Sequence, residues 1–377
     1  MLEDGTLFPG RSFGSPAPQV NQLPENTQFD AAGEIVFNTS MTGYHEILSD
    51  PSYTGQIVVM TYPHIGNYGC DPSWNEAHPA TSPRQFFSSA LVVRSWYDGP
   101  IPPDRIPLAD MMHAEGITGI TDVDTRSLTL TIREHGSCNA LVFSPAGAEA
   151  TEEEIEAARA WLQSVPPMIG RNLAGSAGIG SPEVLNPKGS PHMAVIDCGI
   201  KEQILRELIK RNVKVTLMPA SATARDIRSL QSDACLISNG PGDPSVLTSQ
   251  IETARELSGT MPLFGICLGT QLIALALGGS TYKMEFGHHG GNHPVRDAET
   301  GKTFVTSQNH GFAVDPAKLP KSMSLWFTNA NDQSVEGLKH DTLPICCVQF
   351  HPEAAPGPQD SSWIFDRFLA VTEAHKQ

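Results

Sequence analysis

The sequence predicts a two-part α/β protein. Its C-terminal half should form an open, mostly parallel sheet with helices on both faces, and its N-terminal half a β-rich α+β domain. From residue 192 onward, short apolar runs alternate with segments of helical spacing, which implies right-handed crossovers between parallel strands. Before residue 145, apolar runs rich in β-branched residues are bounded by Gly, Asn, Asp and Pro. Between the halves, residues 166–191 hold many Pro, Gly and Ser with little periodicity, which is typical of a linker.

The N-terminal domain is expected to span residues 1–150. Its apolar runs predict strands at 34–37 and 56–60, and helical spacing predicts a helix at 125–135 that stops at Gly136. Residues 15–32 contain several prolines and little apolar content, which favours a surface loop or an insertion.

The C-terminal domain is expected at 192–377, after a helix and linker at 151–191. Thr151-Glu152-Glu153-Glu154 is a capping-box pattern, and it opens an amphipathic helix that ends near Pro166-Pro167. In the second domain we expect strands at 193–197, 213–218, 234–237 and 262–266, helices at 201–211, 222–230, 248–258 and 270–277, and added β structure near 304–307 and 345–350.

Composition excludes several classes of function. The chain has 377 residues, more than one hydrophobic core usually supports, and 25 Lys and Arg against 41 Asp and Glu give a net charge of −16. A nucleic-acid surface needs clustered basic residues, and the sequence has no basic run beyond isolated pairs. It also has no Gly-x-x-x-x-Gly-Lys-[Ser/Thr] loop for a triphosphate, so we expect no nucleotide cofactor in this chain.

The seven cysteines indicate the compartment. They are an odd number scattered along a long chain, which fits reduced thiols better than a disulfide framework. The acidic start Met1-Leu2-Glu3-Asp4 does not resemble a secretory signal, and the apolar stretches are too short to span a bilayer. A cytoplasmic location is therefore expected.

Gly265-Ile266-Cys267-Leu268-Gly269 is the strongest single motif. It follows an apolar strand and opens an apolar helix, which is the context of a nucleophile elbow with Cys in the place where hydrolases use Ser. A helix N-terminus favours a thiolate, and its free N–H groups can bind an oxyanion. The alternative is a buried cysteine that packs as a small hydrophobic residue, and the two flanking glycines favour the nucleophile.

His351-Pro352-Glu353 provides a candidate base. Proline imposes extended geometry on the residue before it, and positions i and i+2 of an extended segment point the same way. Glu353 can therefore fix the imidazole tautomer of His351 while the other ring nitrogen faces a thiol. Taken in isolation, the tripeptide is more often a turn, and it is the separate cysteine elbow that makes it a credible base.

Ser238-Asn239-Gly240-Pro241-Gly242-Asp243-Pro244 is a third segment that follows a predicted strand. Its glycines let backbone N–H groups point inward as an anion-binding nest, and a plain turn is the alternative. Because the loop follows a strand of the same sheet as the cysteine elbow, we expect it to form the second wall of an oxyanion hole.

Together these three segments resemble the class I glutamine amidotransferases. The resemblance covers nearly the whole chain, because further segments are similar to the small, glutamine-hydrolysing chain of carbamoyl phosphate synthetase. Those segments are Phe37-Asn38-Thr39-Ser40-Met41-Thr42-Gly43-Tyr44, Thr61-Tyr62-Pro63-His64-Ile65-Gly66-Asn67, Asp124-Thr125-Arg126, Phe286-Gly287-His288-His289-Gly290-Gly291-Asn292-His293-Pro294 and Ser307-Gln308-Asn309-His310-Gly311-Phe312.

The resemblance implies roles for particular residues. Cys267, His351 and Glu353 would form the catalytic triad. Oxyanion N–H groups would come from Leu268 and Gly240. Glutamine would be held by Ser40, Gly242, Gln271, Asn309, Gly311 and Phe312, with the pocket near the domain junction because Ser40 lies in the first domain.

The resemblance also implies a partner, which the N-terminal domain at 1–150 would face. Carbamoyl phosphate synthesis, which serves arginine and pyrimidine biosynthesis, needs ATP, bicarbonate and ammonia. ATP and Mg²⁺ are therefore expected on a large synthetase subunit, in a heterodimer with this chain. The sequence departs from the family pattern at Thr270, where His is expected, at Lys201-Glu202-Gln203, which replaces Lys-x-Asn, and in the longer 15–32 loop.

His288, His289 and His293 suggest a metal site by composition. Adjacent histidines rarely bind one ion together, no Cys or carboxylate stands close by in the sequence, and the neighbouring glycines favour a tight structural loop. We therefore expect no metal in this chain.

Three rival interpretations are open on the sequence. The first is another class I amidotransferase that feeds a different synthetase, which the segment with Ser40 argues against. The second is a non-catalytic scaffold subunit, which the intact Cys267, His351 and Glu353 argue against. The third is a cysteine hydrolase without a partner, which a test for a stable complex would distinguish.

Overall fold

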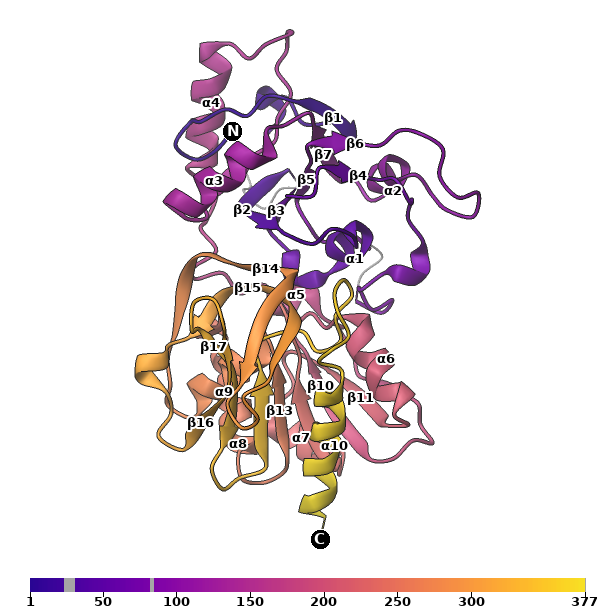
Figure 1. Ribbon diagram of the computed structural model, residues 1–377, viewed down its shortest axis with the longest axis vertical. Coiled ribbons are helices and arrows are strands. Elements are labelled where there is room, and N and C mark those ends of the chain that lie inside the picture. The colour runs from indigo at the N-terminus through magenta and orange to yellow at the C-terminus, as the bar shows by residue number, and fades with distance from the viewer. Residues whose placement is uncertain (24–30, 82–84, 377) are drawn as a thin grey trace. The chain divides into compact units, whose positions relative to one another are not determined.

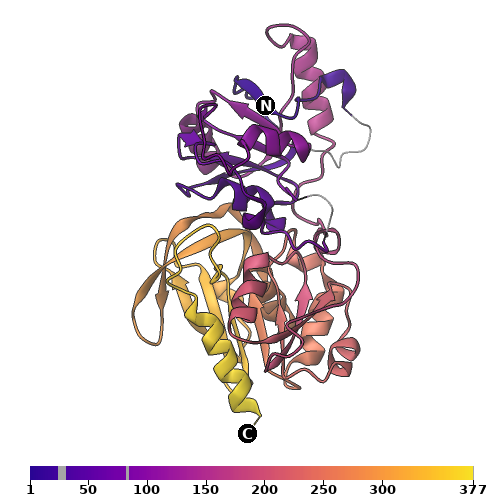
Figure 2. The same cartoon turned by 90° about the vertical axis from the view of Figure 1, so that its right-hand side faces the viewer.

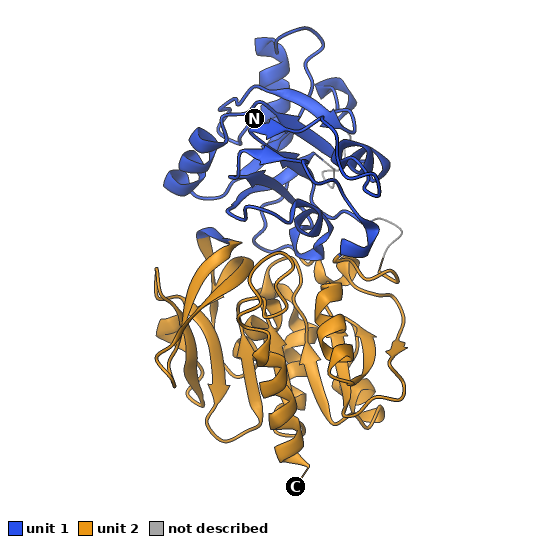
Figure 3. Cartoon of the chain, turned by 45° about the vertical axis from the view of Figure 1, so that its right-hand side comes forward, with its two compact units in different colours: residues 1–75, 84–171, 285–289 blue, residues 76–83, 172–284, 290–377 orange. Residues whose placement is uncertain are grey.

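The computed structural model describes residues 1–23, 31–81 and 85–376, which fall into two compact units (Figure 3). The first unit is Met1–Asn75, Arg84–Arg171 and Glu285–His289, and the second is Glu76–Pro83, Asn172–Met284 and Gly290–Gln377. Both units combine sheets and helices, so the predicted α/β class is confirmed. Part of the loop predicted at 15–32, residues 24–30, lies outside the described residues.

The first unit is built on a six-stranded sheet with the order β1-β7-β5-β3-β2-β8. Its centre is parallel, because β2 pairs with β3, β3 with β5 and β5 with β7 in parallel, while β1 and β8 are antiparallel edges. Successive side chains along each strand point to opposite faces of the sheet, so both faces can carry a core. The strands are β1 (Arg11–Gly14), β2 (Ala32–Asn38), β3 (Gln56–Met60), β5 (Ala90–Val92), β7 (Thr118–Thr121) and β8 (Asn139–Leu141), beside a separate pair of β4 (His64–Ile65) and β6 (Ser95–Trp96).

Helices cover both faces of this sheet (Figure 1). α1 (Tyr44–Ser49) and α2 (Leu108–Ala114) pack on one face, and the sequence analysis identified neither of these short helices. α3 (Thr125–His135) packs on the other face and ends before Gly136, as predicted. α4 (Glu152–Leu162) begins at the predicted capping box, in which the Thr151 hydroxyl accepts from the Glu154 N–H.

The second unit contains a ten-stranded sheet with the order β15-β14-β16-β17-β18-β13-β12-β10-β11-β9. Its central strands β11, β10, β12, β13 and β18 are parallel, and β9, β17 and β16 add antiparallel pairs on either side of them. The strands are β9 (Glu183–Leu185), β10 (His192–Asp197), β11 (Lys214–Pro219), β12 (Ala234–Ile237), β13 (Leu263–Ile266), β14 (Thr281–Asp297), β15 (Thr303–Val314), β16 (Met323–Asn329), β17 (Val335–His340) and β18 (Ile345–Val348).

Helices also cover both faces of the central strands in the second unit (Figure 2). α6 (Glu202–Lys210) and α10 (Trp363–His375) pack on one face of the sheet. Met193 and Val195 of β10 point to this face and belong to the same hydrophobic core. The opposite face is covered by α7 (Ala224–Ser229), α8 (Thr248–Leu257) and α9 (Leu268–Ala276). The sequence analysis did not identify α10.

The expected linker at 166–191 is more ordered than its composition suggests. It contains α5 (Ala174–Ala177) and β9, and β9 pairs with β11 at the edge of the sheet. The change from the first unit to the second falls between Arg171 and Asn172.

Short 3₁₀ turns complete the chain at η1 (Val20–Gln22), η2 (Pro51–Tyr53), η3 (Pro72–Trp74), η4 (Pro244–Val246) and η5 (Pro316–Lys318). Among the described residues, no helix is both long and apolar enough to cross a membrane.

Candidate active site

Cys267 sits in the turn between β13 and α9. It has φ 53° and ψ −105°, a left-handed conformation that is rare for a non-glycine residue and is typical of functional sites. The flanking glycines permit this turn through close packing. A Cβ atom on Gly265 would lie 2.6 Å from the backbone of Gly269, and one on Gly269 would overlap the carbonyl of Ile237. The spacing Gly-x-Cys-x-Gly therefore follows from sterics.

The thiol of Cys267 is surrounded by polar groups although the residue is only 2% exposed. Its Sγ lies 3.5 Å from the carbonyl oxygen of Asn309 and 3.6 Å from Nε2 of Gln349. Gln349 was not identified from the sequence, because its contact with the thiol depends on the packing of β18 beside β13.

His351 and Glu353 lie at the same edge of the sheet as Cys267. β13 and β18 are parallel neighbours, so their carboxyl ends bring Cys267 and the segment after Val348 together. Nδ1 of His351 lies 2.6 Å from Oε1 of Glu353, and the two side chains are 1% and 0% exposed. Among the described residues, Nε2 of His351 makes no hydrogen bond.

The charges around this pair set its protonation. Burial by itself lowers the pKa of His351, but Glu353 and Cys267 outweigh burial and raise that pKa to about 10. Burial raises the pKa of Glu353, but His351 and Lys201 outweigh it and hold that pKa below its usual value. The geometry therefore favours an imidazolium held between a carboxylate and the cysteine.

Lys201 is a second residue at this edge of the sheet to which the sequence analysis assigned no role. It is 2% exposed, and its Nζ lies 3.2 Å from Oε1 of Glu353, donates to the carbonyl of Ala354 and lies 3.9 Å from Oε2 of Glu76. The position of Lys201 was the available signal, because it lies in the short connection from β10 to α6, near the carboxyl end of a central parallel strand.

The loop after β12 packs against the start of α9. The carbonyl of Ser238 accepts from the Gly269 N–H at 3.1 Å, and the side chain of Asn239 bonds the backbone of Lys201 and Gly199. A Cβ atom on Gly240 would overlap the carbonyl of Cys198, and Gly242 has φ 95°, so both positions require glycine.

The N–H groups of Gly240 and Leu268, proposed from the resemblance as oxyanion donors, have no intramolecular acceptor in the described parts of the chain. Leu268 is the first residue of α9, so its N–H is one of the donors that a helix leaves unsatisfied. Both groups are therefore available to an anion.

The second unit brings several of the expected glutamine-binding residues together. Nε2 of Gln271 donates to the carbonyl of Phe312 at 2.7 Å and to Oε1 of Gln349 at 3.0 Å. Asn309 contacts the cysteine through its carbonyl, and Gly311 lies between these residues on β15. Ser40 belongs to the first unit, where its backbone N–H donates to Asn38 at 2.7 Å.

Thr270, a departure from the family pattern, has a definite structural role. Its buried hydroxyl donates to the carbonyl of Val348 at 2.6 Å and lies 3.3 Å from that of Gly265. The Val348 carbonyl also accepts from the Cys267 N–H at 2.8 Å. The hydrogen bond of Thr270 therefore links the first turn of α9 to the end of β18.

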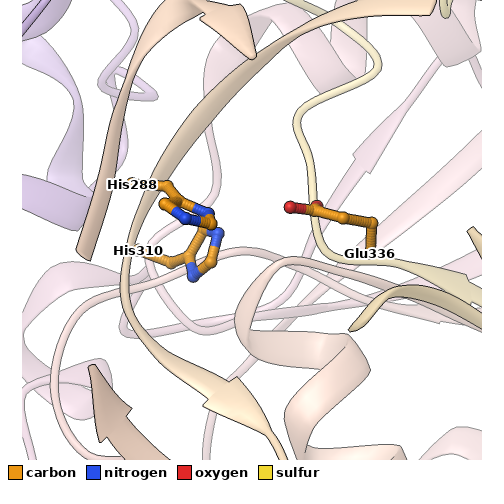
Figure 4. Close-up of side chains that lie close together, drawn as sticks. All are labelled: His288, His310 and Glu336. Carbon is orange, nitrogen blue, oxygen red and sulfur yellow. The ribbon is translucent and has the colours of Figure 1, made fainter. Parts of the chain in front are cut away.

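His310 and Glu336, two buried residues of the second unit, are engaged in hydrogen bonds of their own. In Figure 4, His310 of β15 and Glu336 of β17, both in the second unit, are drawn as sticks. Nδ1 of His310 lies 2.8 Å from the carbonyl of Phe312, and Glu336 accepts from Gln308 at 2.7 Å and Asn329 at 3.0 Å. The sequence prediction of no metal at His288, His289 and His293 stays a prediction.

Comparison with known proteins identifies the family of this chain. Residues 194–371 match the family described as glutamine amidotransferase class-I, and residues 1–142 match the one described as carbamoyl-phosphate synthase small chain, CPSase domain. The carbamoyl phosphate synthase small chain of Methanopyrus kandleri is 43% identical over 378 residues, covering 99% of this chain and 98% of its own length. Those of Symbiobacterium thermophilum and Chlorobaculum tepidum are 42% and 41% identical, covering 99% and 100% of this chain and 98% of each relative.

The fold and the site of the second unit thus define a class I glutamine amidotransferase. The chain as a whole belongs to the carbamoyl phosphate synthase small-chain family.

Proposed function

We propose that this chain hydrolyses L-glutamine through a cysteinyl thioester and passes the ammonia to a large synthetase subunit. The observation that carries the chemistry is the buried arrangement of Cys267, His351 and Glu353 at one edge of the parallel sheet, with Nδ1 of His351 2.6 Å from Glu353. Membership of the carbamoyl phosphate synthase small-chain family supports the same conclusion.

In the first half of the reaction, the Cys267 thiolate attacks the side-chain carbonyl carbon of glutamine. The resulting oxyanion accepts hydrogen bonds from the N–H groups of Leu268 and Gly240, and losing one such donor costs roughly 3–4 kcal/mol of barrier. The imidazolium of His351 then gives its Nε2 proton to the departing nitrogen. Ammonia leaves, and a thioester links Cys267 to the γ-carbonyl.

In the second half, a water molecule attacks the thioester while Nε2 of His351 takes its proton. The tetrahedral intermediate collapses, the C–S bond breaks, and glutamate leaves with the thiolate restored. Glu353 holds the imidazole through Nδ1 in both halves. Lys201 compensates the buried charge of Glu353 when His351 is neutral. Gln271, Asn309, Gly242, Gly311, Phe312 and Ser40 would position the amino acid.

The ATP-dependent steps are assigned to the partner. The large subunit would bind ATP and Mg²⁺ and combine ammonia with bicarbonate to give carbamoyl phosphate, for arginine and pyrimidine biosynthesis. The absence of a triphosphate-binding loop from the sequence supports this division, as does the charge of −16. No metal or nucleotide cofactor is assigned to this chain, and a cytoplasmic heterodimer is the form we propose.

A comparison of two nitrogen sources tests the proposal. The complex with the large subunit should make carbamoyl phosphate from either glutamine or ammonium. Cys267→Ser should abolish the glutamine-dependent reaction by several orders of magnitude and spare the ammonium-dependent one. If the variant complex loses both reactions equally, Cys267 acts in assembly or folding, and its proposed role as nucleophile is wrong.

A further inference from the structure

A hollow of about 530 Å³ lies in the first unit at the carboxyl edge of its parallel strands. Thr61 directly follows β3, Arg94 comes soon after β5, and Asp124 lies between β7 and α3. Open α/β sheets bind ligands at this edge. The segments Thr61-Tyr62-Pro63 and Asp124-Thr125-Arg126 both carry the family resemblance, yet the proposed glutamine chemistry uses neither of them.

Three arginines give the hollow its charge. Arg94, Arg126 and Arg133 all line it and all are exposed. In the parts of the chain that the structure describes, none of the three forms an ion pair, and the one hydrogen bond that Arg94 makes is to the Val123 carbonyl, at 3.5 Å. Other arginines of this acidic chain do pair with carboxylates, among them Arg11, Arg105 and Arg211.

The geometry of these arginines suits an oxyanion. Arg126 and Arg133 are seven residues apart on α3 and therefore lie on one face of the helix, two turns from each other. Arg94 comes from a different element, so the three guanidinium groups can converge on one ligand from two sides. Planar guanidinium groups bind phosphate oxygens in pairs, and three in one hollow concentrate positive potential locally.

The remaining lining fits a ligand that also carries a hydroxyl group. Asp124 caps α3, because its Oδ1 accepts from the Ser127 N–H at 3.0 Å, and this leaves Oδ2 to accept a hydrogen bond from a ligand. The volume is within the range of roughly 300–1,000 Å³ that is usual for small-molecule sites. A phosphate monoester with a neighbouring hydroxyl group matches both the three arginines and the Asp124 carboxylate.

We propose that this hollow is a second ligand site, which binds a small phosphate-bearing molecule through Arg94, Arg126 and Arg133. The site lies in the first unit and shares no residue with the proposed glutamine chemistry. Its test is therefore independent of the proposed function.

Calorimetric titration of the full chain with glycerol 3-phosphate and with inorganic phosphate, at low ionic strength, tests the proposal. The natural chain should bind glycerol 3-phosphate saturably at one site and inorganic phosphate more weakly. Arg126→Gln should weaken binding about tenfold, and the triple variant with Arg94→Gln and Arg133→Gln should abolish it. Arg11→Gln is the matched control, since Arg11 is an exposed arginine of the same unit and should leave the affinity unchanged.

Two results would overturn the proposal. One is no saturable binding of either probe to the natural chain. The other is an equal loss of affinity in Arg126→Gln and Arg11→Gln, which would show a general charge effect. If neither probe binds and Arg126→Gln instead weakens assembly with the large subunit, the hollow is a docking surface for acidic side chains of the partner, and the small-molecule site is wrong. Thermal melts identify any variant that fails to fold, and Arg126→Gln alone then decides the outcome.

Discussion

The ammonium group of Lys201 lies 3.2 Å from Oε1 of Glu353, the same oxygen that lies 2.6 Å from Nδ1 of His351. The carboxylate thus faces two cationic partners in a site where all three side chains are almost fully buried. Removing one member of a buried charged group leaves the others uncompensated, and the penalty is large in a medium of low dielectric constant.

We predict that Lys201→Met lowers both stability and glutamine hydrolysis. Glu353 and Glu76 would lose a buried cation, and breaking such a group costs about 3–5 kcal/mol. Urea unfolding followed by circular dichroism measures the loss. Lys210→Met is the control, because Lys210 is a lysine with a 74% exposed side chain in the same unit. Equal midpoints for the two variants would contradict the prediction.

The stability of the second unit should depend on pH through His78. Its Nδ1 lies 2.6 Å from Glu202 and its Nε2 3.1 Å from Glu183. Burial lowers the pKa of His78, but these two carboxylates outweigh burial and raise it from 6.5 to about 8. The stabilisation is therefore complete below about pH 6.5 and is lost as the pH rises through 8.

We predict that the natural chain loses about 2 kcal/mol of stability from this group between pH 6 and pH 9, and that His78→Gln removes the dependence. Unfolding midpoints measured across this range for both chains check the result. A natural chain and a variant with parallel pH profiles would show that the two contacts do not stabilise the fold.

The parts of the site that depend on local geometry could be predicted from the sequence, and the parts that depend on packing could not. The turn at Cys267 needs glycines two residues away on either side, so a short motif indicates it. His351 and Glu353 do face each other, but the extended segment expected between them is wrong, because Pro352 and Glu353 form a turn in which the Ala354 N–H donates to the His351 carbonyl at 3.1 Å. Gln349 contacts the thiol of Cys267 only because β18, the strand that precedes it, lies beside β13. The partner of Lys201 lies more than 150 residues away in the sequence.

The same distinction applies to the fold. α3 and α4 carry their own capping residues, Asp124 and Thr151, and their starts were predicted correctly. β9 is three residues long and lies in a Pro- and Gly-rich stretch, where only its pairing with β11 makes it a strand. α1 and α2 are six and seven residues long, too short for a clear helical period.

The close packing at the start of α9 gives a steric prediction. Gly269→Ala would place a methyl group against the carbonyl of Ile237, in backbone that cannot move without separating β12 from α9. We expect a loss of about 3 kcal/mol or more in unfolding free energy. Gly175→Ala is the control, because a Cβ atom there meets nothing within 4 Å. A midpoint for Gly269→Ala equal to that of the control would show that the turn relaxes freely.

The last prediction concerns selective modification of the seven cysteines. Burial raises the pKa of Cys70, Cys235 and Cys347 to about 12 and also raises that of Cys138, Cys198 and Cys346. These six thiols therefore stay protonated at neutral pH, and a protonated thiol is a poor nucleophile. Cys267 is also buried, yet His351 beside it has a pKa of about 10 and carries a positive charge at pH 7. A neighbouring cation favours the reactive, thiolate form of a cysteine in general.

Iodoacetamide at pH 7 should therefore alkylate Cys267 first, and mass spectrometry of the peptides would locate the label. His351→Gln should slow this reaction by about tenfold or more, because the thiolate loses its neighbouring cation. His375→Gln, which changes an exposed histidine of α10, should leave the rate unchanged. Glutamine in excess should protect Cys267 if the substrate covers it. Primary labelling at Cys346 or Cys347, or an unchanged rate in His351→Gln, would contradict the assignment of Cys267 as a nucleophile activated by His351.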